Sequence, residues 1–422
     1  MAESGYCFYV GIDWATATHQ VTVLDPERHL IGERSVAHTG EALAELADWL
    51  TQLASGAPER VAIAIEVPRG AVVETMLERG FHVFAINPKQ LDRFRDRHTV
   101  AGAKDDRRDA FVLGDALRTD RPAFRRIYPE DPLIVQLREH SRLDDDLLQA
   151  LVRLTNRLRE QLIRFYPQPL ALCPAADELW LWALLEVAPT PTTAHRLTRP
   201  RIARLLRSHH IRRFTADDLL AQLHTPALHV ASGTAEAASA HIALLVPRLR
   251  LLRDQRSACA RQIEDVLAHL EQRAVIEGQP GEHGDVAILQ SLPGVGRTIA
   301  ATMLAEAGWA LAARNYRALR ALAGIAPVTK KSGKRRLVLM RLGCNRRLRY
   351  AFYHWGRGAI QSDPRARAHY QELRQRGHSH GRALRGVVDR LLAMLIAMLT
   401  ARTLYDSNRR LVVVPGAGEK TT

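Results

Sequence analysis

Two apolar segments near the N-terminus, each ending in a carboxylate, place the strongest constraint on the fold of this chain. Residues 6–13 (Tyr-Cys-Phe-Tyr-Val-Gly-Ile-Asp) and 61–66 (Val-Ala-Ile-Ala-Ile-Glu) are apolar runs of strand length. Such runs are typical of strands that are buried on both faces of a sheet. The sequence therefore predicts two central strands, which end in Asp13 and Glu66.

The elements expected around these strands follow a definite order. Strands are expected at 20–24, 29–33 and 81–86, and helices at 40–54, 72–79 and 106–117. Three strands in a meander, followed by alternating helices and strands, is the order of the ribonuclease-H-like fold, and βαβ units imply parallel strands. We therefore expect an α/β domain over residues 1–125.

Two long stretches rich in leucine and arginine predict a second, all-α part. Residues 130–166 and 241–272 repeat leucine at three- and four-residue spacing, which indicates an antiparallel helical hairpin or coiled coil. The proline-containing segment between them is expected to be a small helical insertion. The expected division is a helical region at 126–280 with its insertion at about 167–240, a helical C-terminal domain at 281–410 and a disordered tail at 411–422.

The balance of charge favours a polyanionic partner. Lys and Arg number 60 and Asp and Glu 45, which gives a net charge of +15 and points to nucleic acid. The longest apolar run, 391–401, is shorter than the ~20 residues that cross a bilayer, and no signal peptide is recognised. The four cysteines are widely separated, which argues against a zinc site or disulfides and fits a reducing cytoplasm.

Four carboxylates form the first candidate site. Asp13 and Glu66 end predicted central strands, while Asp106 and Asp109 lie three residues apart and share one helix face. Such a set can hold two Mg²⁺ ions for phosphoryl transfer, and the repulsion among its members implies a cation. The alternative is structural: two strand ends, with Asp106 as a helix cap and Asp109 in the first turn. Asp105 also shares a face with Asp109, so the helical pair is not unique.

A rival fold is that of the actin-like ATPases and sugar kinases, which also open with a strand ending in Gly-x-Asp. These proteins need a glycine-rich turn after the aspartate to bind phosphate. Residues 14–19 (Trp-Ala-Thr-Ala-Thr-His) contain no glycine, which argues against nucleotide hydrolysis.

Glycines between two helical segments form the second candidate site. Residues 289–300 read helix, glycine turn, helix, and Arg297 opens the second helix. This is the pattern of the helix-hairpin-helix motif, in which Gly294 and Gly296 would let the backbone approach a phosphate that the N–H groups of the second helix bind. A plain packing corner between two helices is the alternative.

A serine inside a basic segment forms the third candidate site. Residues 330–349 contain nine basic residues and no acidic one. Ser332 lies in this predicted loop, where cations would neutralise the charge that develops when a hydroxyl attacks a phosphodiester. The loop offers no base or metal to take the hydroxyl proton, so the alternative is a turn residue that contacts phosphate.

Together these residues resemble the DEDD-type insertion-sequence transposases. The resemblance rests on the four carboxylates, the Pro-Gly-Val-Gly turn at 293–296 and the run Leu-Ala-Gly-Ile-Ala-Pro…Ser-Gly-Lys…Gly-Cys-Asn-Arg-Arg-Leu-Arg at 322–349. Family members combine an N-terminal half similar to the RuvC-type Holliday-junction resolvase with a C-terminal transposase domain that carries a serine nucleophile. The insertion at about 167–240 is not explained by this resemblance.

The resemblance implies a role for each matched residue. The four carboxylates would bind Mg²⁺, with Mn²⁺ as an alternative, and Ser332 would form a covalent phosphoserine link to a cleaved strand. The three-residue spacing of the family's helical pair favours Asp106, although Asp105 stands where the family usually has a small or neutral residue. The expected nucleic-acid contacts are Gly294, Gly296, Arg297, Lys330, Lys331, Lys334, Arg335, Arg336, Arg341, Asn345 and Arg349.

The resemblance also implies partners and an activity. The partners are DNA at the element ends and the target, a structured bridge or seeker RNA as guide, and further copies of the chain. In such a dimer or tetramer, the carboxylates of one subunit would meet Ser332 of another. The expected activity is site-specific DNA recombination, through a circular intermediate, in the bacterial cytoplasm and in association with the nucleoid.

Two other functions stay open. A structure-selective junction nuclease would use metal-activated water and the four carboxylates but not Ser332. A non-enzymatic nucleic-acid-binding protein would rely on charge and the hairpin alone. A basic stretch at Arg93, Arg95, Arg97 and Lys104 is a candidate RNA surface, with a solvated helix face as the alternative.

Overall fold

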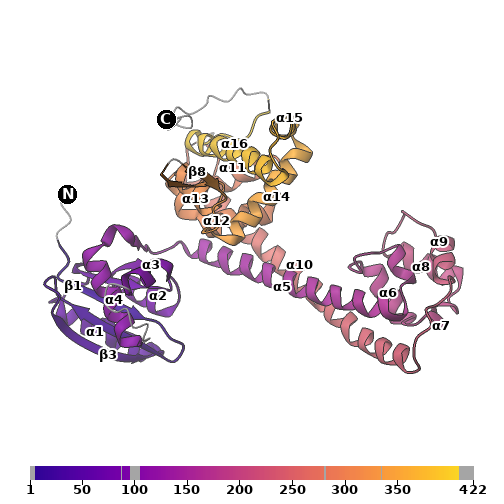
Figure 1. The fold of residues 1–422 in the computed structure, drawn as a ribbon, viewed down its shortest axis with the longest axis horizontal. Helices are drawn as coiled ribbons and strands as arrows, with labels where there is room; N and C mark the ends of the chain where they lie inside the picture. The colour runs from indigo at the N-terminus through magenta and orange to yellow at the C-terminus, as the bar shows by residue number, and fades with distance from the viewer. Residues whose placement is uncertain (1–4, 87, 96–104, 280–281, 334, 408–422) are drawn as a thin grey trace. The chain divides into compact units, whose positions relative to one another are not determined.

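Two compact units make up the computed structural model, which describes residues 5–86, 88–95, 105–279, 282–333 and 335–407. The first unit extends to Asp131 and the second begins at Pro132. Over the described residues, the first is a mixed α/β domain and the second is helical apart from one β-hairpin (Figure 1), in agreement with the expected α/β and all-α classes. The residues 97, 104, 280–281 and 334 and the predicted tail lie outside the described residues.

A six-stranded sheet in the order β3-β2-β1-β4-β5-β6 forms the first unit. β1 (Phe8–Asp13) is antiparallel to β2 (Thr18–Leu24), which is antiparallel to β3 (Leu30–Ala37). β1 runs parallel to β4 (Val61–Ile65), and β4 runs parallel to β5 (His82–Ala85). β6 (Arg125–Arg126) pairs with β5, and sequence patterns do not predict it because two residues are too few to show an alternation.

Helices cover both faces of this sheet. α1 (Gly40–Leu53) and α2 (Ala71–Glu78) pack on one face, and α3 (Pro88–Arg95) and α4 (Asp106–Thr119) pack on the other. The residues of β4 alternate between the two cores, with Ile63 and Ile65 under α1 and α2 and with Ala62 and Ala64 under α4. The small alanine side chains allow α4 to lie close to the sheet.

Two glycines bring α4 into backbone contact with β1. A Cβ on Gly11 would lie 1.8 Å from the carbonyl oxygen of Ala110 and 2.6 Å from the nitrogen of Gly114. A Cβ on Gly114 would lie 3.2 Å from the nitrogen of Gly11. Because Ala110 lies over Gly11, the first turn of α4 is held near Asp13, the last residue of β1.

Two long helices form the frame of the second unit. α5 (Pro132–Phe165) and α10 (Thr234–Glu277) pack side by side (Figure 1). The chain between them is helical, as expected, and its helices share a core with the adjoining ends of α5 and α10 that includes Trp180 and Trp182. These helices are α6 (Leu179–Val187), α7 (Pro191–Ala194), α8 (Arg199–Ser208) and α9 (Ala216–Leu223).

Short 3₁₀ turns occur in both units. Two lie in the first unit, at Pro58–Arg60 and Arg121–Ala123, and one lies in the second, at Gln168–Ala171.

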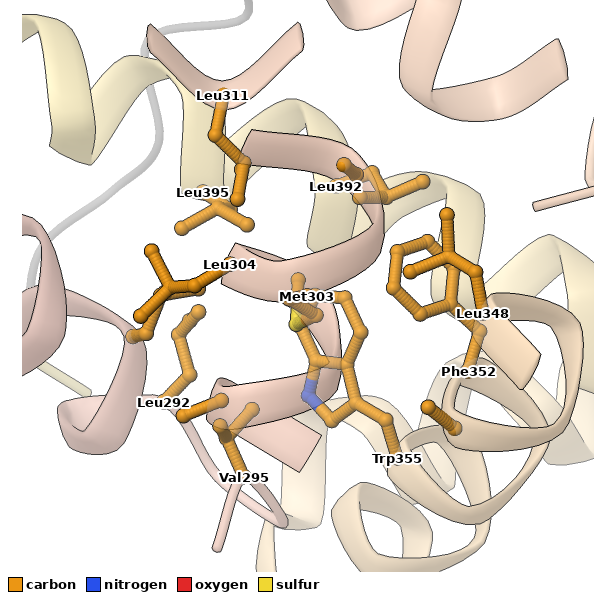
Figure 2. Close-up of a cluster of buried hydrophobic side chains, with 14 of the residues drawn as sticks. Leu292, Val295, Met303, Leu304, Leu311, Leu348, Phe352, Trp355, Leu392 and Leu395 are labelled. Carbon is orange, nitrogen blue, oxygen red and sulfur yellow. The ribbon is translucent and has the colours of Figure 1, made fainter. Parts of the chain in front are cut away.

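The remaining helices of this unit surround a further core. Figure 2 shows Met303, Trp355 and Leu392 in that core, on three different helices. The last helix ends at Ala401, because Arg402 adopts a left-handed conformation with φ of +50°. The helices are α11 (Asp285–Ser291), α12 (Arg297–Ala312), α13 (Tyr316–Leu322), α14 (Arg346–Ser362), α15 (Pro364–Gln375) and α16 (His380–Ala401). In the described ranges, every helix is too short or too polar to span a membrane.

A β-hairpin stands where the sequence analysis expects a loop around Ser332. β7 (Val328–Ser332) pairs with β8 (Arg335–Leu339), and Ser332 lies opposite Arg335. Gly333 has a φ of +54° at the turn, a left-handed value that favours glycine. The expectation of a loop was wrong because β7 is largely polar and exposed, so it lacks the apolar alternation of a half-buried strand.

A buried ion-pair network joins α5, α12 and the start of α14. The side chain of Glu306 is 6% exposed, and it accepts hydrogen bonds from Arg142 Nε at 3.1 Å and from Asn345 Nδ2 at 2.7 Å. Arg347 Nε lies 3.4 Å from the same carboxylate, and another guanidinium nitrogen of Arg347 donates to the carbonyl of Ser141. Burial alone would raise the pKa of Glu306, but these partners outweigh it and the pKa is lowered.

Glu306→Gln should lower the free energy of unfolding by about 3 kcal/mol, because it removes the buried carboxylate that pairs with Arg142 and Arg347, although Arg347 keeps its pair with Asp145. Chemical denaturation followed by circular dichroism measures this loss. The folded pKa of Glu306 lies below its unfolded value, so the wild-type advantage is present above ~pH 4.3 and disappears as the pH falls through the folded pKa. Glu186→Gln, in a surface pair with Arg250, is the control and should cost less than about 1 kcal/mol. Equal losses in the two variants would contradict the network.

Gly11→Ala should destabilise the first unit by about 3 kcal/mol or more, because the new methyl group has backbone atoms of α4 in its place. Thermal unfolding followed by circular dichroism measures this loss. Gly40→Ala is the matched control, since a Cβ at Gly40 meets nothing within 4 Å. A melting temperature equal to that of the wild type in the Gly11 variant would show that α4 does not need this contact.

Candidate active site and nucleic-acid interface

The sheet brings the first two carboxylates to the same edge. Asp13 is the last residue of β1, and Glu66 directly follows β4. β1 and β4 are parallel neighbours in which Ile12 lies opposite Ile65, so the residues after these two positions leave the sheet side by side. The buried strands predicted from the sequence thus do end in adjacent acidic residues.

The helical carboxylates lie in the first turn of α4. Asp109 is buried, with 3% of its surface exposed, whereas Asp106 is exposed. Asp105 is the N-cap of α4, because its side chain accepts a hydrogen bond from the backbone N–H of Arg107 at 3.2 Å. The capping role that the structural alternative gives to Asp106 therefore belongs to Asp105.

Three other carboxylates act on the electrostatics of Asp13. Burial, followed by the charges of Asp109, Asp106 and Glu66, raises the pKa of Asp13 to about 6, and the nearby charge of Arg95 partly opposes them. The carboxylates at 66, 106 and 109 therefore all act on Asp13, and we call these four residues the acidic set.

Arg95 of α3 holds one member of the acidic set. Its Nε lies 2.8 Å from Asp109 Oδ1 and its Nη2 lies 2.9 Å from Asp109 Oδ2, which is a bidentate pair. The same guanidinium also donates to Asp92 at 2.7 Å. Arg95 therefore has internal partners and is not free for the RNA contact considered from the sequence, while Arg93 is exposed.

The donors of the acidic set fit a divalent cation. Carboxylate oxygens are the ligands that Mg²⁺ and Mn²⁺ prefer, and a cation would relieve the repulsion that raises the pKa of Asp13. Two tighter groups, in which the ligand atoms all lie within 4.8 Å, are found elsewhere. They are Asp25, Glu27 and His29, and Cys173, Asp177 and Glu178. Both groups have internal partners, since Asp25 pairs with His29 and Glu178 pairs with Arg213.

The glycine turn between α11 and α12 packs closely against α14. Gly294 has a φ of +79°, and a Cβ on it would lie 2.4 Å from the nitrogen of Ala359. Trp355 Nε1 donates to the carbonyl of Pro293 at 3.1 Å. The close approach that Gly294 allows is thus to another helix, as in the packing-corner alternative. A Cβ on Gly296 would meet nothing within 4 Å, so this position at the start of α12 is open.

The hairpin of β7 and β8 exposes the third candidate site. Ser332 is the last residue of β7 and is exposed, as are Lys330, Lys331, Arg335 and Arg336. Lys334, the remaining basic residue expected here, lies outside the described residues. Within the described part, the hairpin presents a hydroxyl group among positive charges.

Several residues expected to bind nucleic acid have internal partners. Asn345 caps α14 by accepting from the N–H of Leu348 at 3.1 Å, and it also donates to Glu306. Arg349 donates to the carbonyls of Arg341 and Leu342 at 2.7 and 3.1 Å. These side chains fix the segment between the hairpin and α14.

Two further basic side chains expected to bind nucleic acid also have partners within the chain. Arg341 Nε donates to the carbonyl of Ala326 at 3.3 Å. Arg297 pairs with Glu264. The pair of Arg297 and Glu264 is about half exposed, whereas the contact of Arg341 is partly buried.

Sequence reasoning missed two kinds of residue that shape the acidic set. Gly11 and Gly114 let α4 touch β1, and the available signal was a glycine inside an otherwise apolar strand. The pairing of Arg95 with Asp109 had no local signal, because the two residues lie on different helices, 14 positions apart.

Comparisons with known proteins match both ends of the chain. Residues 10–167 match the family model of DEDD transposases, described as "Transposase". Residues 286–371 match the model described as "Transposase IS116/IS110/IS902 family". The first region contains the acidic set, and the second contains the glycine turn and Ser332.

Relatives that match the whole chain or part of it are also proteins of insertion elements or transposase candidates. The chain is 31% identical over 416 residues to the mini-circle transposase candidate for IS117 of Streptomyces coelicolor, which covers 97% of this chain and 98% of that protein. It is 51% identical over 218 residues to the transposase candidate y4uE of Sinorhizobium fredii, which covers 51% of this chain and 60% of that protein. An uncharacterized 43.6 kDa protein of insertion element IS110 from Streptomyces coelicolor is 29% identical over 310 residues, covering 72% of this chain and 73% of that protein.

Millimolar Mg²⁺ should raise the melting temperature of the protein by a few degrees at pH 7.5, because the cation relieves the repulsion in the acidic set. The shift should shrink below about pH 6, where a proton competes for Asp13. Differential scanning fluorimetry measures it, and Asp13→Asn should remove most of it.

Asp25→Asn is the matched control for cation binding, because Asp25 belongs to a separate group of potential ligands. This variant should keep the shift. A shift that survives in the Asp13 variant but disappears in the Asp25 variant would move the cation away from the acidic set.

Proposed function

Because this chain belongs to the DEDD transposases of the IS116/IS110/IS902 family, we propose that it recombines the DNA of an insertion sequence with its acidic set and Ser332. The protein is an enzyme that cleaves and rejoins DNA. The observation that carries the proposal is geometric: Asp13 and Glu66 stand at the ends of two adjacent parallel strands, and Asp106 and Asp109 lie in the first turn of α4, which packs on β1. The raised pKa of Asp13, caused by burial and by Asp109, Asp106 and Glu66, agrees with this crowding. Such crowding is unfavourable for a structural site and favourable for one that receives cations.

We propose that the first unit works as a ribonuclease-H-like domain of the RuvC type. Its order of strands and the positions of its carboxylates at one sheet edge support this role. Asp13, Glu66, Asp106 and Asp109 would hold Mg²⁺ or Mn²⁺, which when bound stabilises the charge that develops on the phosphate oxygens. Arg95 orients Asp109 through its bidentate contact, and a bound cation would share this carboxylate with it.

In this proposal Ser332 is the nucleophile. Its Oγ attacks a backbone phosphorus atom, its proton passes to a carboxylate of the acidic set, and the bond from phosphorus to the sugar oxygen breaks. The proton then goes to the departing sugar oxygen. A hydroxyl of another strand later attacks the phosphoserine and releases Ser332, so the number of phosphodiester bonds is conserved. The exposed position of Ser332 beside Lys330 and Arg335 supports its access to a strand.

We propose that the two half-sites come from different subunits of a dimer or tetramer. The hairpin carries no carboxylate, so Ser332 needs a proton acceptor from elsewhere. The long helices α5 and α10 are the proposed coiled-coil connection between subunits. Leu244 and Leu251 are exposed seven residues apart on α10, which is the heptad spacing of a further helix contact.

We further propose that a structured RNA selects the DNA sites and that the exposed hairpin and Gly296 contact phosphate groups. The net charge of +15 supports binding to both nucleic acids. The internal partners of Gly294 and Arg349 leave Lys330, Lys331, Arg335 and Arg336 as the more accessible phosphate contacts, together with Lys334, which is outside the described residues.

A junction nuclease that uses metal-activated water is the second candidate function. It would need the acidic set but not the exposed serine. The exposed position of Ser332 among basic residues favours the recombinase, because the nuclease gives this hydroxyl no role.

Ser332→Ala should reduce recombination by roughly 10³-fold or more while DNA binding stays within a few-fold of wild type, because the variant removes the nucleophile alone. A recombination assay with matched DNA sites and RNA, together with a gel assay for protein-linked DNA, measures both steps. Thr329→Ala on the same strand is the matched control and should retain activity, since its hydroxyl lies on the opposite face of β7. Normal cleavage by the Ser332 variant would favour the junction nuclease.

The same assay tests the composite site by mixing inactive subunits. Asp13→Asn and Ser332→Ala are each expected to be inactive alone. In mixed oligomers, an intact acidic set on one subunit can meet an intact serine on the other, so activity should partly return. No recovery in verified mixed oligomers would place both half-sites in one chain.

A further inference from the structure

The exposed face of α14 is unusual in composition. Tyr350 and Tyr353 are 65% and 38% exposed, while the opposite face of the same helix is buried through Phe352 and Trp355. Helical spacing places Tyr350, Tyr353, His354 and two arginines on one stripe. We call this stripe the α14 aromatic face, and its members are Arg346, Tyr350, Tyr353, His354 and Arg357.

The rings of the α14 aromatic face contact one another. The centroids of Tyr350 and His354 lie 4.6 Å apart, and those of Tyr353 and His354 lie 5.5 Å apart. Arg357 lies over the ring of Tyr353 at 6.0 Å. The cluster continues to α16, where His380 lies 6.3 Å from Tyr353. Large rings are therefore gathered at the surface, where burial in the chain's own core does not account for them.

The charge around this face is positive. α14 contains no acidic residue. Acidic residues on the helices packed against it have their own partners: Asp363 caps α15, Glu372 pairs with Arg376, and Asp389 pairs with Arg320.

Three arginines on α14 and α16, two helices that pack together, form what we call the arginine cluster: Arg349, which directly precedes Tyr350, Arg382 and Arg385. Burial, together with the neighbouring charges of Arg349 and Arg382, lowers the pKa of Arg385. The hydrogen-bond acceptor observed for Arg385 is the sulfur of Met340, a weak one, at 3.4 Å. The charges of Arg349 and Arg382 therefore repel that of Arg385, and an anion bound there would relieve this repulsion.

We propose that the α14 aromatic face binds unpaired nucleotides, with bases stacked on Tyr350 and Tyr353 and phosphates held by Arg346, Arg357 and the arginine cluster. Exposed tyrosines interleaved with arginine suit single strands, because every base has a π-face while a duplex hides its bases in the stack. A protein partner is less suited to the face, since the absence of acidic residues on α14 matches a polyanion. The inference rests on the proposed function in that the chain handles nucleic acid, but it requires neither cations nor Ser332.

Fluorescence anisotropy tests the proposal with the full-length protein in EDTA, so that strand cleavage plays no part. The probes are a labelled single-stranded DNA, an RNA of the same sequence and the corresponding duplex DNA. The double variant Tyr350→Ala with Tyr353→Ala should bind at least one single strand about tenfold or more weakly, which is the effect of removing one base-aromatic stack. Duplex binding should change by less than about twofold. A larger loss for RNA or for DNA identifies which strand the face binds.

The matched control is Tyr350→Phe with Tyr353→Phe, which keeps both rings and should bind like the wild type. Photo-crosslinking of the unmodified protein to a single strand, with the linked peptide mapped by mass spectrometry, should mark residues 350–353 without any substitution. Unchanged single-strand binding in the alanine variant, or an equal loss for single strands and duplex, would overturn the proposal. A change in oligomeric mass without a change in binding would assign the face to a protein contact instead.

Binding and catalysis can fail separately in these tests. The tyrosine substitutions can also be made in the Ser332→Ala protein. A loss of single-strand binding there supports nucleotide binding by the α14 aromatic face, independently of recombination. If the protein with both tyrosines replaced recombines and binds single strands normally, the proposed function stands and only the role of the α14 aromatic face is refuted.

Discussion

The backbone contact between β1 and α4 determines where the carboxylates of the first unit meet. Gly11 and Gly114 remove two side chains that would hold the helix away from the sheet, and the helix then lies close to the strand that ends in Asp13. The first turn of α4 carries Asp106 and Asp109. The close packing at Gly11 and Gly114 therefore brings these two charges near Asp13 at the edge of the sheet. Repulsion in the acidic set opposes folding, and the packing beneath α4 must therefore hold the helix against it.

In the second unit the corresponding role belongs to the carboxylate of Glu306. It joins Arg142 of α5 to Asn345 and Arg347 at the start of α14, directly after the hairpin that carries Ser332. Arg349 then holds the carbonyls of the segment that follows β8. Asn345 and Arg349 thus fix the chain that connects β8 to α14, while Ser332 at the end of β7 stays exposed.

The sequence was most informative where a pattern is local. Apolar runs predicted β1 and β4, leucine spacing predicted α5 and α10, and the acidic residues after the strands do meet. It was least informative where a residue's partner lies far along the chain. Gly294 makes room for α14 and not visibly for a phosphate, and Arg95 pairs with Asp109. The hairpin around Ser332 was missed because exposed strands lack the apolar alternation on which prediction depends.

Within the described residues, the first unit carries the acidic set and the second carries exposed basic side chains on its hairpin, so the two groups have opposite charge. The acidic set lacks enough positive charge, since Arg95 is shared between Asp109 and Asp92. The hairpin and the arginine cluster lack enough negative charge, since Lys330 and Arg335 are exposed and Arg385 lies beside other arginines. Cations would relieve the repulsion in the acidic set, and phosphate groups that among the basic side chains. A nucleic-acid strand with its bound divalent cations supplies both kinds of charge. The acidic set and the basic side chains therefore favour the same ligand, although their own charges are opposite.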